Sequence, residues 1–219
     1  MWGPRGGEAG RSRVSEEKKR GLLVVISGPS GVGKTTIARQ LESRCRGEFS
    51  VSATTRPKTP ADVEGRDYYF LTEEDFRGRV ERGEMLEHAQ VFGKYWYGTP
   101  REPVERALRE GRLIILEIDV QGGVQVRSRY PRKPGGESEA FMIFIEPPGE
   151  GALLERLRGR GRDSEEAIQR RFSEAKREIE MAHASGAYDL FVMNDELDDA
   201  IDQVCKAVEK RRQGSTIAD

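Results

Sequence analysis

The stretch ISGPSGVGKTTIA (Ile26–Ala38) decides the fold. It begins as an apolar strand, runs through three glycines and a lysine, and ends in residues that can start a helix. Gly28 to Thr35 fits G-x-x-x-x-G-K-[ST], a motif that binds phosphate where it joins a strand to a helix. Glycines let the backbone fold around an anion, while the N–H groups, the helix N-terminus and Lys34 supply positive potential. A tight turn that binds nothing requires neither lysine nor threonine at these places, so we expect a phosphate-binding loop.

The composition of the whole chain bounds the possibilities. Its 219 residues suit one domain with appendages, and its 37 Lys and Arg nearly balance 38 Asp and Glu. Nothing therefore marks it as a binder of nucleic acid or membrane surfaces. The two cysteines, Cys45 and Cys205, lack the spacing of a metal or redox motif and fit a reducing compartment. There is no apolar run near the ~20 residues that span a bilayer, and no apolar signal-peptide core. We expect a soluble, cytoplasmic protein.

Strand-like and helical segments alternate along most of the chain. Compact apolar runs rich in β-branched residues predict buried parallel strands at Leu22–Ser27, Arg112–Val120, Ala140–Glu146 and Tyr188–Asn194. Helical patterns alternate with them at Lys34–Arg44, Pro100–Arg109, Gly149–Leu157, Ser164–Ala184 and Asp198–Arg211. This alternation predicts an α/β fold in which helices flank both faces of a parallel sheet.

A different pattern between Val51 and Gly98 interrupts this alternation. It contains short alternating segments such as RDYYFL and a small helix from Thr72 to Arg82, which Thr72 caps and Gly83 stops. We expect a small mixed α+β insertion at about 51–99, within a core formed by 21–50 and 100–211. Residues 1–20, rich in glycine and charge, predict a flexible tail, and 212–219 form a short C-terminal tail.

Two carboxylates follow the central apolar run. Glu117 and Asp119 are two residues apart, so on a strand they point to the same side. Carboxylates at the C-terminal end of such a strand adjoin the phosphate loop in this fold class. The alternative is a pair of ordinary strand-end charges that face solvent.

Six further blocks occur in order along the chain. They are SATTRP (Ser52–Pro57), EGRDYYF (Glu64–Phe70), LEHAQVFGKYWYGTP (Leu86–Pro100), LEIDVQG (Leu116–Gly122), RLRGRGRDSEEAIQRR (Arg156–Arg171) and VMND (Val192–Asp195). With the phosphate loop, they make Leu22–Arg211 resemble guanylate kinases, which are P-loop nucleoside monophosphate kinases.

The resemblance implies a P-loop three-layer fold with a GMP-binding insertion and a helical lid at about 156–175. It also implies Mg²⁺-assisted, in-line transfer of the γ-phosphoryl group of ATP to GMP, and also to dGMP, with ADP and GDP as the products from GMP.

The resemblance also assigns residues to the donor nucleotide. The implied ATP-binding residues are Gly28, Pro29, Ser30, Gly31, Val32, Gly33, Lys34, Thr35, Thr36, Arg156, Arg160 and Asn194. Thr35 and, through water, Glu117 are the implied Mg²⁺ contacts. Phosphoryl transfer depends on alignment and on neutralising charge, and the implied catalytic residues are Lys34, Arg56, Arg160 and Arg171.

For the acceptor, Glu87 matches the family's guanine-reading glutamate. A carboxylate only accepts hydrogen bonds, whereas guanine offers N1–H and N2–H₂ side by side and adenine presents a lone pair at N1. Arg56, Tyr68 and Tyr97 match the ligands of the GMP phosphate. The full set of implied GMP-binding residues is Ser52, Thr55, Arg56, Tyr68, Glu87, Tyr97, Gly98, Thr99 and Asp119.

Three departures from the family pattern affect the pocket for the GMP phosphate. Thr59 stands where the family usually has a second phosphate-binding arginine, and Lys58 beside it is either a substitute or a solvated loop charge. Ala61 and Asp62 stand where family chains commonly have Gly-Glu. One extra residue before Tyr97 leaves it open whether Tyr95 or Tyr97 faces the pocket.

Two rival functions remain at this stage. One is a related P-loop kinase that acts on AMP or a sugar phosphate, which Glu87 together with Ser52 disfavours. The other is a guanylate-kinase-like interaction module without catalysis, which the intact phosphate loop disfavours. The sequence leaves both a monomer and a dimer open.

Overall fold

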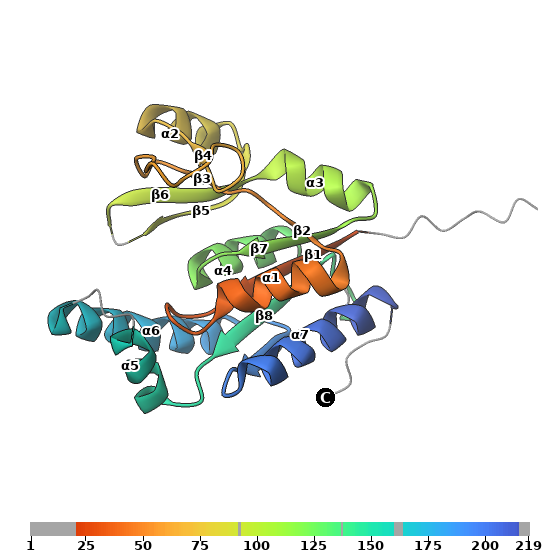
Figure 1. Cartoon of the computed structure of the whole chain (residues 1–219). Helices are drawn as coiled ribbons and strands as arrows, with labels where there is room; N and C mark the ends of the chain where they lie inside the picture. Colours follow the sequence, from red (N-terminus) through yellow and green to blue (C-terminus); the bar gives the residue numbers. More distant parts are fainter. Residues whose placement is uncertain (1–20, 92, 137, 160–163, 215–219) are drawn as a thin grey trace, which may run out of the picture.

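The computed structural model describes residues 21–91, 93–136, 138–159 and 164–214, and within these residues the strands form two sheets. Each neighbouring pair in the larger sheet is parallel. Its strands lie in the order β2 (Glu48–Phe49), β7 (Leu113–Glu117), β1 (Leu22–Ser27), β8 (Ala140–Glu146) and β9 (Leu190–Met193). This architecture confirms the predicted α/β class (Figure 1).

The central strand β1 explains why the fold has three layers. All six of its residues are buried, and alternate side chains enter two separate cores. Val24 and Ile26 pack with residues of α1 and α7, whereas Leu23 and Val25 pack with residues of α3, α4 and α6. A strand buried on both faces needs the continuous apolar run that the sequence shows.

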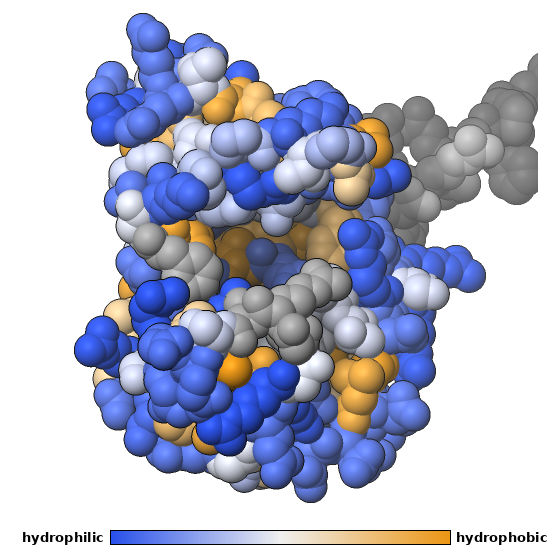
Figure 2. Space-filling view, turned by 60° about the vertical axis from the view of Figure 1, so that its left-hand side comes forward, coloured by the Kyte–Doolittle hydropathy of each residue, from blue (hydrophilic) through white to orange (hydrophobic). Residues whose placement is uncertain are grey.

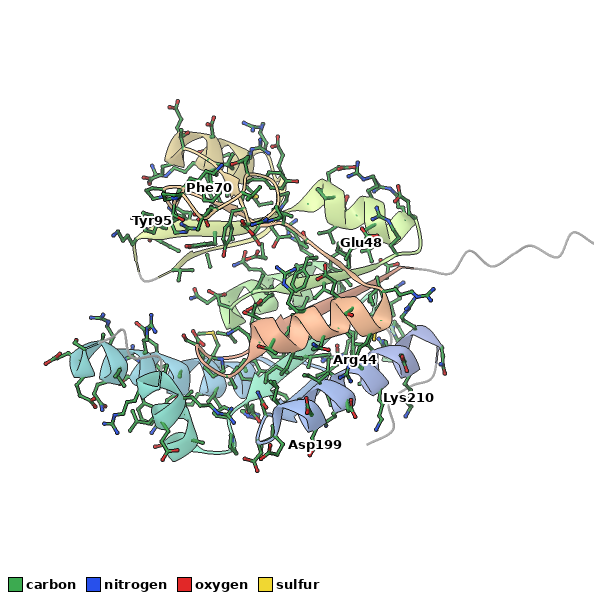
Figure 3. All side chains as sticks on the ribbon, viewed as in Figure 1. Arg44, Glu48, Phe70, Tyr95, Asp199 and Lys210 are labelled. Carbon is green, nitrogen blue, oxygen red and sulfur yellow. The ribbon has the colours of Figure 1, made fainter. Side chains whose placement is uncertain are left out.

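Helices connect the strands and cover both faces of this sheet (Figure 1). They are α1 (Lys34–Cys45), α2 (Glu73–Glu81), α3 (Arg101–Arg109), α4 (Val120–Arg129), α5 (Glu150–Arg158), α6 (Glu165–Ser185) and α7 (Leu197–Arg212). Arg44 of α1 and Lys210 of α7 are exposed (Figure 3), and Arg44 forms an ion pair with Asp202 of α7 at 2.6 Å. None of the helices within the described residues is long and apolar enough to cross a bilayer.

The smaller sheet lies within the stretch predicted as an insertion. Its strands lie in the order β4 (Tyr69–Phe70), β3 (Ala53–Thr54), β6 (Tyr95–Pro100) and β5 (Met85–Val91). The sheet is mixed, because β3 pairs parallel with β4 and antiparallel with β6. Phe76 of α2 packs against Ala53 and Met85, and Thr72 caps α2 by accepting from the backbone N–H of Asp75.

The structure corrects the sequence prediction after the central apolar run. The predicted strand Arg112–Val120 ends at Glu117, and α4, which was not predicted, begins at Val120. Asp119 is the N-cap of this helix rather than a strand residue, with its Oδ1 accepting from the Gly122 N–H at 2.8 Å. Gly122 and Gly123 lower the helix propensity of this segment, which hides the helix from a pattern search.

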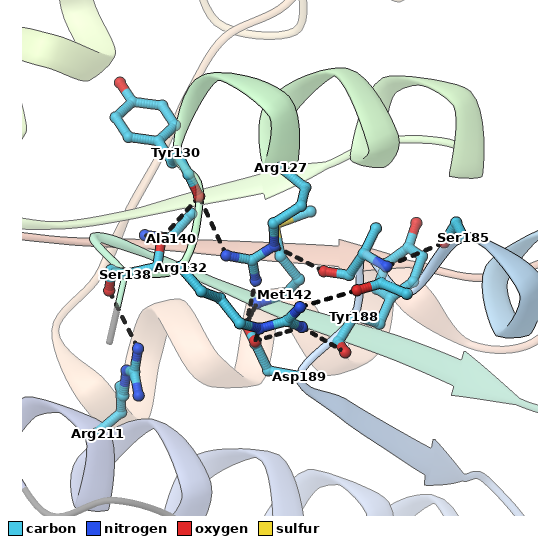
Figure 4. Close-up of polar contacts among 12 residues, drawn as sticks. Arg127, Tyr130, Arg132, Ser138, Ala140, Met142, Ser185, Tyr188, Asp189 and Arg211 are labelled. Atoms are coloured by element: carbon cyan, nitrogen blue, oxygen red, sulfur yellow. Dashed lines mark hydrogen bonds and ion pairs between the residues drawn. The ribbon is translucent and has the colours of Figure 1, made fainter. Parts of the chain in front are cut away.

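A buried polar network ties the N-terminal end of β9 to its neighbours (Figure 4). Asp189 accepts from the backbone N–H of Met142 at 2.9 Å and from Arg132 Nε at 2.8 Å, and it forms a closely spaced ion pair with Arg127. The side chains of Arg127 and Asp189 are 11% and 15% exposed. Charges this well enclosed are stable only when paired, so the network fixes the start of β9 against β8.

The two cysteines, far apart in sequence, meet between α1 and α7. Cys45 and Cys205 are both buried free thiols. Burial raises the pKa of Cys45 to about 12, with a smaller contribution from the neighbouring Cys205. Both side chains belong to the core between the two helices, so they act here as small apolar residues.

Candidate active site

The predicted phosphate-binding loop joins β1 to α1. Gly28 and Gly33 have φ angles of +151° and +95°, which strain any residue with a side chain. A Cβ atom on Gly28 would also lie 2.4 Å from the carbonyl oxygen of Ile145. The Nζ of Lys34 donates to the carbonyls of Gly28 at 2.5 Å and Pro29 at 3.0 Å. The loop therefore curls around its own lysine at the N-terminus of α1, an arrangement suited to an anion.

Thr35 and Glu117, the predicted Mg²⁺ contacts, lie together. The Thr35 hydroxyl donates to Glu117 Oε1 at 2.7 Å, because β7 pairs with β1 and ends beside the loop. The described residues contain no cluster of three or more His, Cys, Asp or Glu that would form a metal site of protein ligands alone. A hydroxyl and a carboxylate next to a phosphate site fit Mg²⁺, which is usually held by few protein oxygens plus water and substrate phosphates.

Asn194, a predicted ATP-binding residue, braces the loop. Its side chain is 4% exposed, and its Nδ2 donates to the Val32 carbonyl at 2.8 Å. A Cβ atom on Gly33 would lie 2.6 Å from this nitrogen. The Oδ1 of Asn194 is buried without a hydrogen-bond partner, leaving an acceptor for a ligand or water. Ser30 lies on the loop itself, and Thr36 is exposed in the first turn of α1.

Two of the three predicted lid arginines lie within the described residues. Arg156 lies on α5, and its Nη2 donates to the Asp195 carbonyl at 3.1 Å. The next residue, Leu157, packs against the phosphate-binding loop. Arg171 is half-buried on α6, and Arg160 lies outside the described residues. The two helices share a small apolar cluster of their own, separate from the two main cores.

Glu87 is enclosed where β5 faces the core. It is 4% exposed, and its Oε1 accepts from the hydroxyl of Thr99, its partner on β6, at 2.6 Å. A Cβ atom on Gly122 of α4 would lie 2.6 Å from Glu87 Oε2, so a larger residue there would have to displace the carboxylate. Burial raises the pKa of Glu87 to about 7, opposed by the Thr99 hydrogen bond and reinforced by the negative charge of Asp119. Three predicted GMP-binding residues thus lie together, namely Glu87, Thr99 and Asp119.

Other predicted acceptor residues shape the same sheet. Thr55 Oγ1 accepts from the Trp96 N–H at 3.0 Å, and the Ser52 carbonyl accepts from the Tyr69 N–H at 2.9 Å. A Cβ atom on Gly98 would lie 2.8 Å from a carbonyl of β5, so glycine allows the two strands to approach closely. These contacts fix the loop that leads from β3 toward the predicted phosphate ligands.

Those phosphate ligands, Arg56, Tyr68 and Tyr97, form one cluster. The rings of Tyr68 and Tyr97 lie 5.7 Å apart, and Arg56 Cζ lies 5.4 Å from the centroid of Tyr68. Tyr95 instead lies beside Lys94, whose Nζ is 4.9 Å from the Tyr95 ring centroid. The geometry therefore selects Tyr97 over Tyr95 as the member of this cluster.

The two halves of the site border a hollow. Figure 2 shows the surface recessed at the height that separates the smaller sheet from the larger one in Figure 1. The phosphate-binding loop follows β1 of the larger sheet, whereas Glu87, Tyr68 and Tyr97 belong to the smaller sheet and its loops. Such an arrangement can hold two ligands on opposite sides of one cleft.

Three residues near the site were not singled out as site residues by sequence reasoning. Gln125 of α4 accepts from the His88 N–H at 3.2 Å and donates to the His88 carbonyl at 2.8 Å. Glu178 of α6 faces Lys34, and burial raises its pKa to about 7. Asp62 binds Arg56. Gln125 lies on α4, which sequence does not predict, and Glu178 lies on α6, whose pattern is that of an ordinary helix. In the sequence, Asp62 stands out only as a departure from the family pattern.

Comparison with known proteins agrees with these features. The guanylate kinase family model matches residues 20–211. Guanylate kinases of Thermosynechococcus vestitus and Lactococcus lactis are 47% and 44% identical over 189 and 193 residues, which cover 86% and 88% of this chain and 93% and 89% of the relatives. The crystal structure of guanylate kinase from Anaplasma phagocytophilum superposes with a TM-score of 0.68 at 31% identity, covering 89% of this chain and 88% of that one. The chain belongs to the guanylate kinase family.

Proposed function

We propose that this protein transfers the γ-phosphoryl group of ATP to GMP, and also to dGMP, and that the products from GMP are ADP and GDP. The observation that carries the proposal is the buried carboxylate of Glu87 beside the Thr99 hydroxyl, on the smaller sheet, while the phosphate-binding loop follows β1 of the larger sheet. An ionised carboxylate in such a site accepts from guanine N1–H and N2–H₂ and leaves adenine unpaired. Membership of the guanylate kinase family supports the same acceptor.

The acceptor phosphate is proposed to bind Arg56, Tyr68 and Tyr97, which already lie together. An arginine fork matches phosphate oxygens, and phenolic hydroxyls donate to them without adding charge. Lys58 is the further cation that we propose for attraction, since its Nζ lies 5.9 Å from the same Phe70 ring that Arg56 contacts at 5.4 Å. Phe70 lies on the smaller sheet (Figure 3).

The donor phosphates are proposed to bind the loop N–H groups and Lys34, with Arg156, Arg160 and Arg171 approaching from the lid. Thr35 and Glu117 fit a Mg²⁺ ion, which neutralises phosphate oxygens when it is bound. The transition state places charge on the transferring oxygens, so catalysis requires these cations and in-line alignment rather than a protein base. Closure of the cleft would exclude water, the competing acceptor.

The proposed division of the chain assigns 51–99 to GMP and the core with its lid to ATP. We also propose a cytoplasmic location with no nucleic-acid or membrane partner, a location with which the two unpaired cysteines agree.

The test is a coupled assay of ADP formation with ATP, Mg²⁺ and each nucleoside monophosphate separately. GMP should give a kcat/KM at least about a hundredfold above AMP, CMP and UMP, because a buried polar site rejects a base that cannot pair with it. Comparable turnover of AMP would overturn the acceptor assignment.

A further inference from the structure

Asp62, which departs from the family pattern, lies in a closed ring of hydrogen bonds. Its carboxylate accepts from Arg56 Nη1 at 3.0 Å and Nη2 at 2.9 Å. The backbone N–H and the hydroxyl of Thr59 both donate to Oδ2 at 2.7 Å. The side chains of Arg56 and Asp62 are 24% and 15% exposed, and these donors hold the pKa of Asp62 well below its usual range.

The ring leaves one edge of the Arg56 guanidinium available. Besides its bond to Asp62, Nη1 donates to the Pro57 carbonyl at 3.1 Å, so its two hydrogens are engaged. Of the five N–H groups of an arginine, the remaining two are on Nε and Nη2 and form one side of the fork. Two parallel donors on one edge suit two oxygens of a phosphate.

We propose that Asp62, anchored by Thr59, is a positioning residue that fixes the Arg56 fork for the phosphate of GMP. The inference rests on the proposed function for the identity of the ligand. It assigns a purpose to two departures from the family pattern at once. In place of a second arginine, Thr59 supplies a neutral hydroxyl that holds the carboxylate, and the carboxylate holds the arginine that is present.

The net charge of the Arg56–Asp62 pair explains why it matters that Arg56 is held in place. Arg56 and Asp62 together carry no net charge, so the pair attracts a dianionic phosphate less than two arginines would. Lys58 is proposed to add attraction, but its flexible stem cannot supply a fixed fork. Geometry must come from Arg56, and an arginine that is already immobilised loses less side-chain entropy on binding. The tyrosine hydroxyls of Tyr68 and Tyr97 add donors without changing this balance.

The opposite interpretation is that Asp62 competes with the phosphate for Arg56. Two observations favour positioning. Asp62 uses one edge of the fork and leaves the other, so binding does not require the ion pair to break. Thr59 holds the carboxylate with two donors from its own residue, so Asp62 stays in place whether or not a ligand is bound.

The two interpretations give opposite signs for Thr59→Val, which removes the hydroxyl without changing charge or volume greatly. Positioning predicts that the Kd and KM for GMP rise about fivefold, because the arginine must be ordered on binding. The Kd for guanosine, which has no phosphate, should stay within about twofold, and so should the KM for ATP. Competition predicts tighter GMP binding, because a loosened carboxylate releases the arginine.

Asp62→Asn tests the contact between the Asp62 carboxylate and Arg56. It should weaken GMP binding at least as much as Thr59→Val, and the double variant should be no weaker than Asp62→Asn alone, since both act through one contact. Thr59→Ser restores the hydroxyl and should return GMP affinity to the wild-type value. The matched control is Asp67→Asn, because Asp67 also pairs with an arginine, Arg66, and accepts a backbone N–H at 2.7 Å.

The outcomes distinguish failure of the proposed function from failure of the positioning role of Asp62. If the wild-type protein does not phosphorylate GMP, the proposed function fails. If it does, but Thr59→Val and Asp62→Asn bind GMP as tightly as wild type or more tightly, the positioning role is overturned. Equal losses for GMP and guanosine in folded variants would also overturn it, because the effect would not then concern the phosphate.

Discussion

At the residue scale, Glu87 combines two properties by which the proposed binding of guanine should depend on pH. Burial raises its pKa to about 7, yet only the ionised form can accept both guanine N–H groups. Below pH 7 the free protein therefore carries mostly the neutral carboxyl, and binding must release a proton. We predict that guanosine affinity rises about tenfold from pH 6 to pH 8, the change in the ionised fraction for a pKa of 7.

Guanosine is the ligand to use, because the phosphate of GMP titrates near pH 6 and would add its own effect. Calorimetry in buffers of different ionisation enthalpy would count the proton released. Glu87→Gln should bind guanosine and GMP at least about tenfold more weakly, keep ATP affinity and lose the pH dependence. If the guanosine affinity of the wild-type protein does not change between pH 6 and pH 8, ionisation of the buried Glu87 does not control guanosine binding.

A second prediction at the residue scale concerns the contribution of Lys34 to kcat. Lys34→Ala should lower kcat at least about a hundredfold in steady-state assays, because the lost charge stabilises the transferring phosphoryl group. The variant should remain folded, since the Lys34 ammonium donates to carbonyls of its own loop, Gly28 and Pro29, and belongs to neither main core. Lys206→Ala, an exposed lysine on α7, is the control. Near-normal turnover of Lys34→Ala would remove the loop from the mechanism.

At the element scale, β5 is an edge strand whose outer side is bound by a side chain. The Gln125 amide accepts and donates at the main chain of His88, as a neighbouring strand would, one residue from Glu87. Gln125→Ala should raise the KM for GMP about threefold to tenfold, because two hydrogen bonds that hold β5, the strand proposed to bind guanine, against α4 are lost. The KM for ATP should not change.

Gln203→Ala, an exposed glutamine on α7, is the matched control for that variant. A drop in melting temperature with an unchanged KM for GMP would mean that Gln125 serves stability alone.

The elements also mark what sequence could and could not predict. The phosphate-binding loop, the buried strands and most helices follow from local pattern, since β-branched runs and a glycine-rich motif have few alternative structures. Helix α4 was missed because Gly122 and Gly123 lower its helix propensity, while the close approach of Glu87 and Tyr188 from other elements, which no local pattern contains, favours glycine there. Strand β3 was not delimited because a strand of two residues carries no periodicity.

The same limit applies to the site. The family pattern named Arg56, Tyr68 and Glu87, and the structure brings each beside another predicted residue. It could not name Gln125, whose contact lies 37 residues away in sequence, nor the partner of Thr59. Those depend on how the loop and the two sheets are arranged in space.

At the scale of the whole molecule, the proposed chemistry and the stability of the sheet depend on different strands. The phosphate-binding loop follows the central strand β1, whereas the Asp189 network holds the start of the edge strand β9 against β8. Asp189→Asn leaves Arg127 and Arg132 without their charge partner. We expect it to destabilise the fold by about 3 kcal/mol and lower Tm by roughly 6–12 °C.

The same variant should keep kcat and both KM values within about twofold at 25 °C. Calorimetry and steady-state kinetics on one preparation would check both statements. A large loss of activity in the folded variant would mean that the edge strand β9 and the phosphate-binding loop are coupled.

The central claim is that one cleft passes a phosphoryl group from ATP to GMP rather than to water or to another nucleotide. The most direct measurement is one reaction with γ-labelled ATP, Mg²⁺ and an equimolar mixture of GMP, AMP, CMP and UMP, followed by separation of the labelled products. We predict that nearly all the label appears in GDP, in equal amount to the ADP formed. Label released mainly as inorganic phosphate, or carried by another nucleoside diphosphate, would contradict the claim.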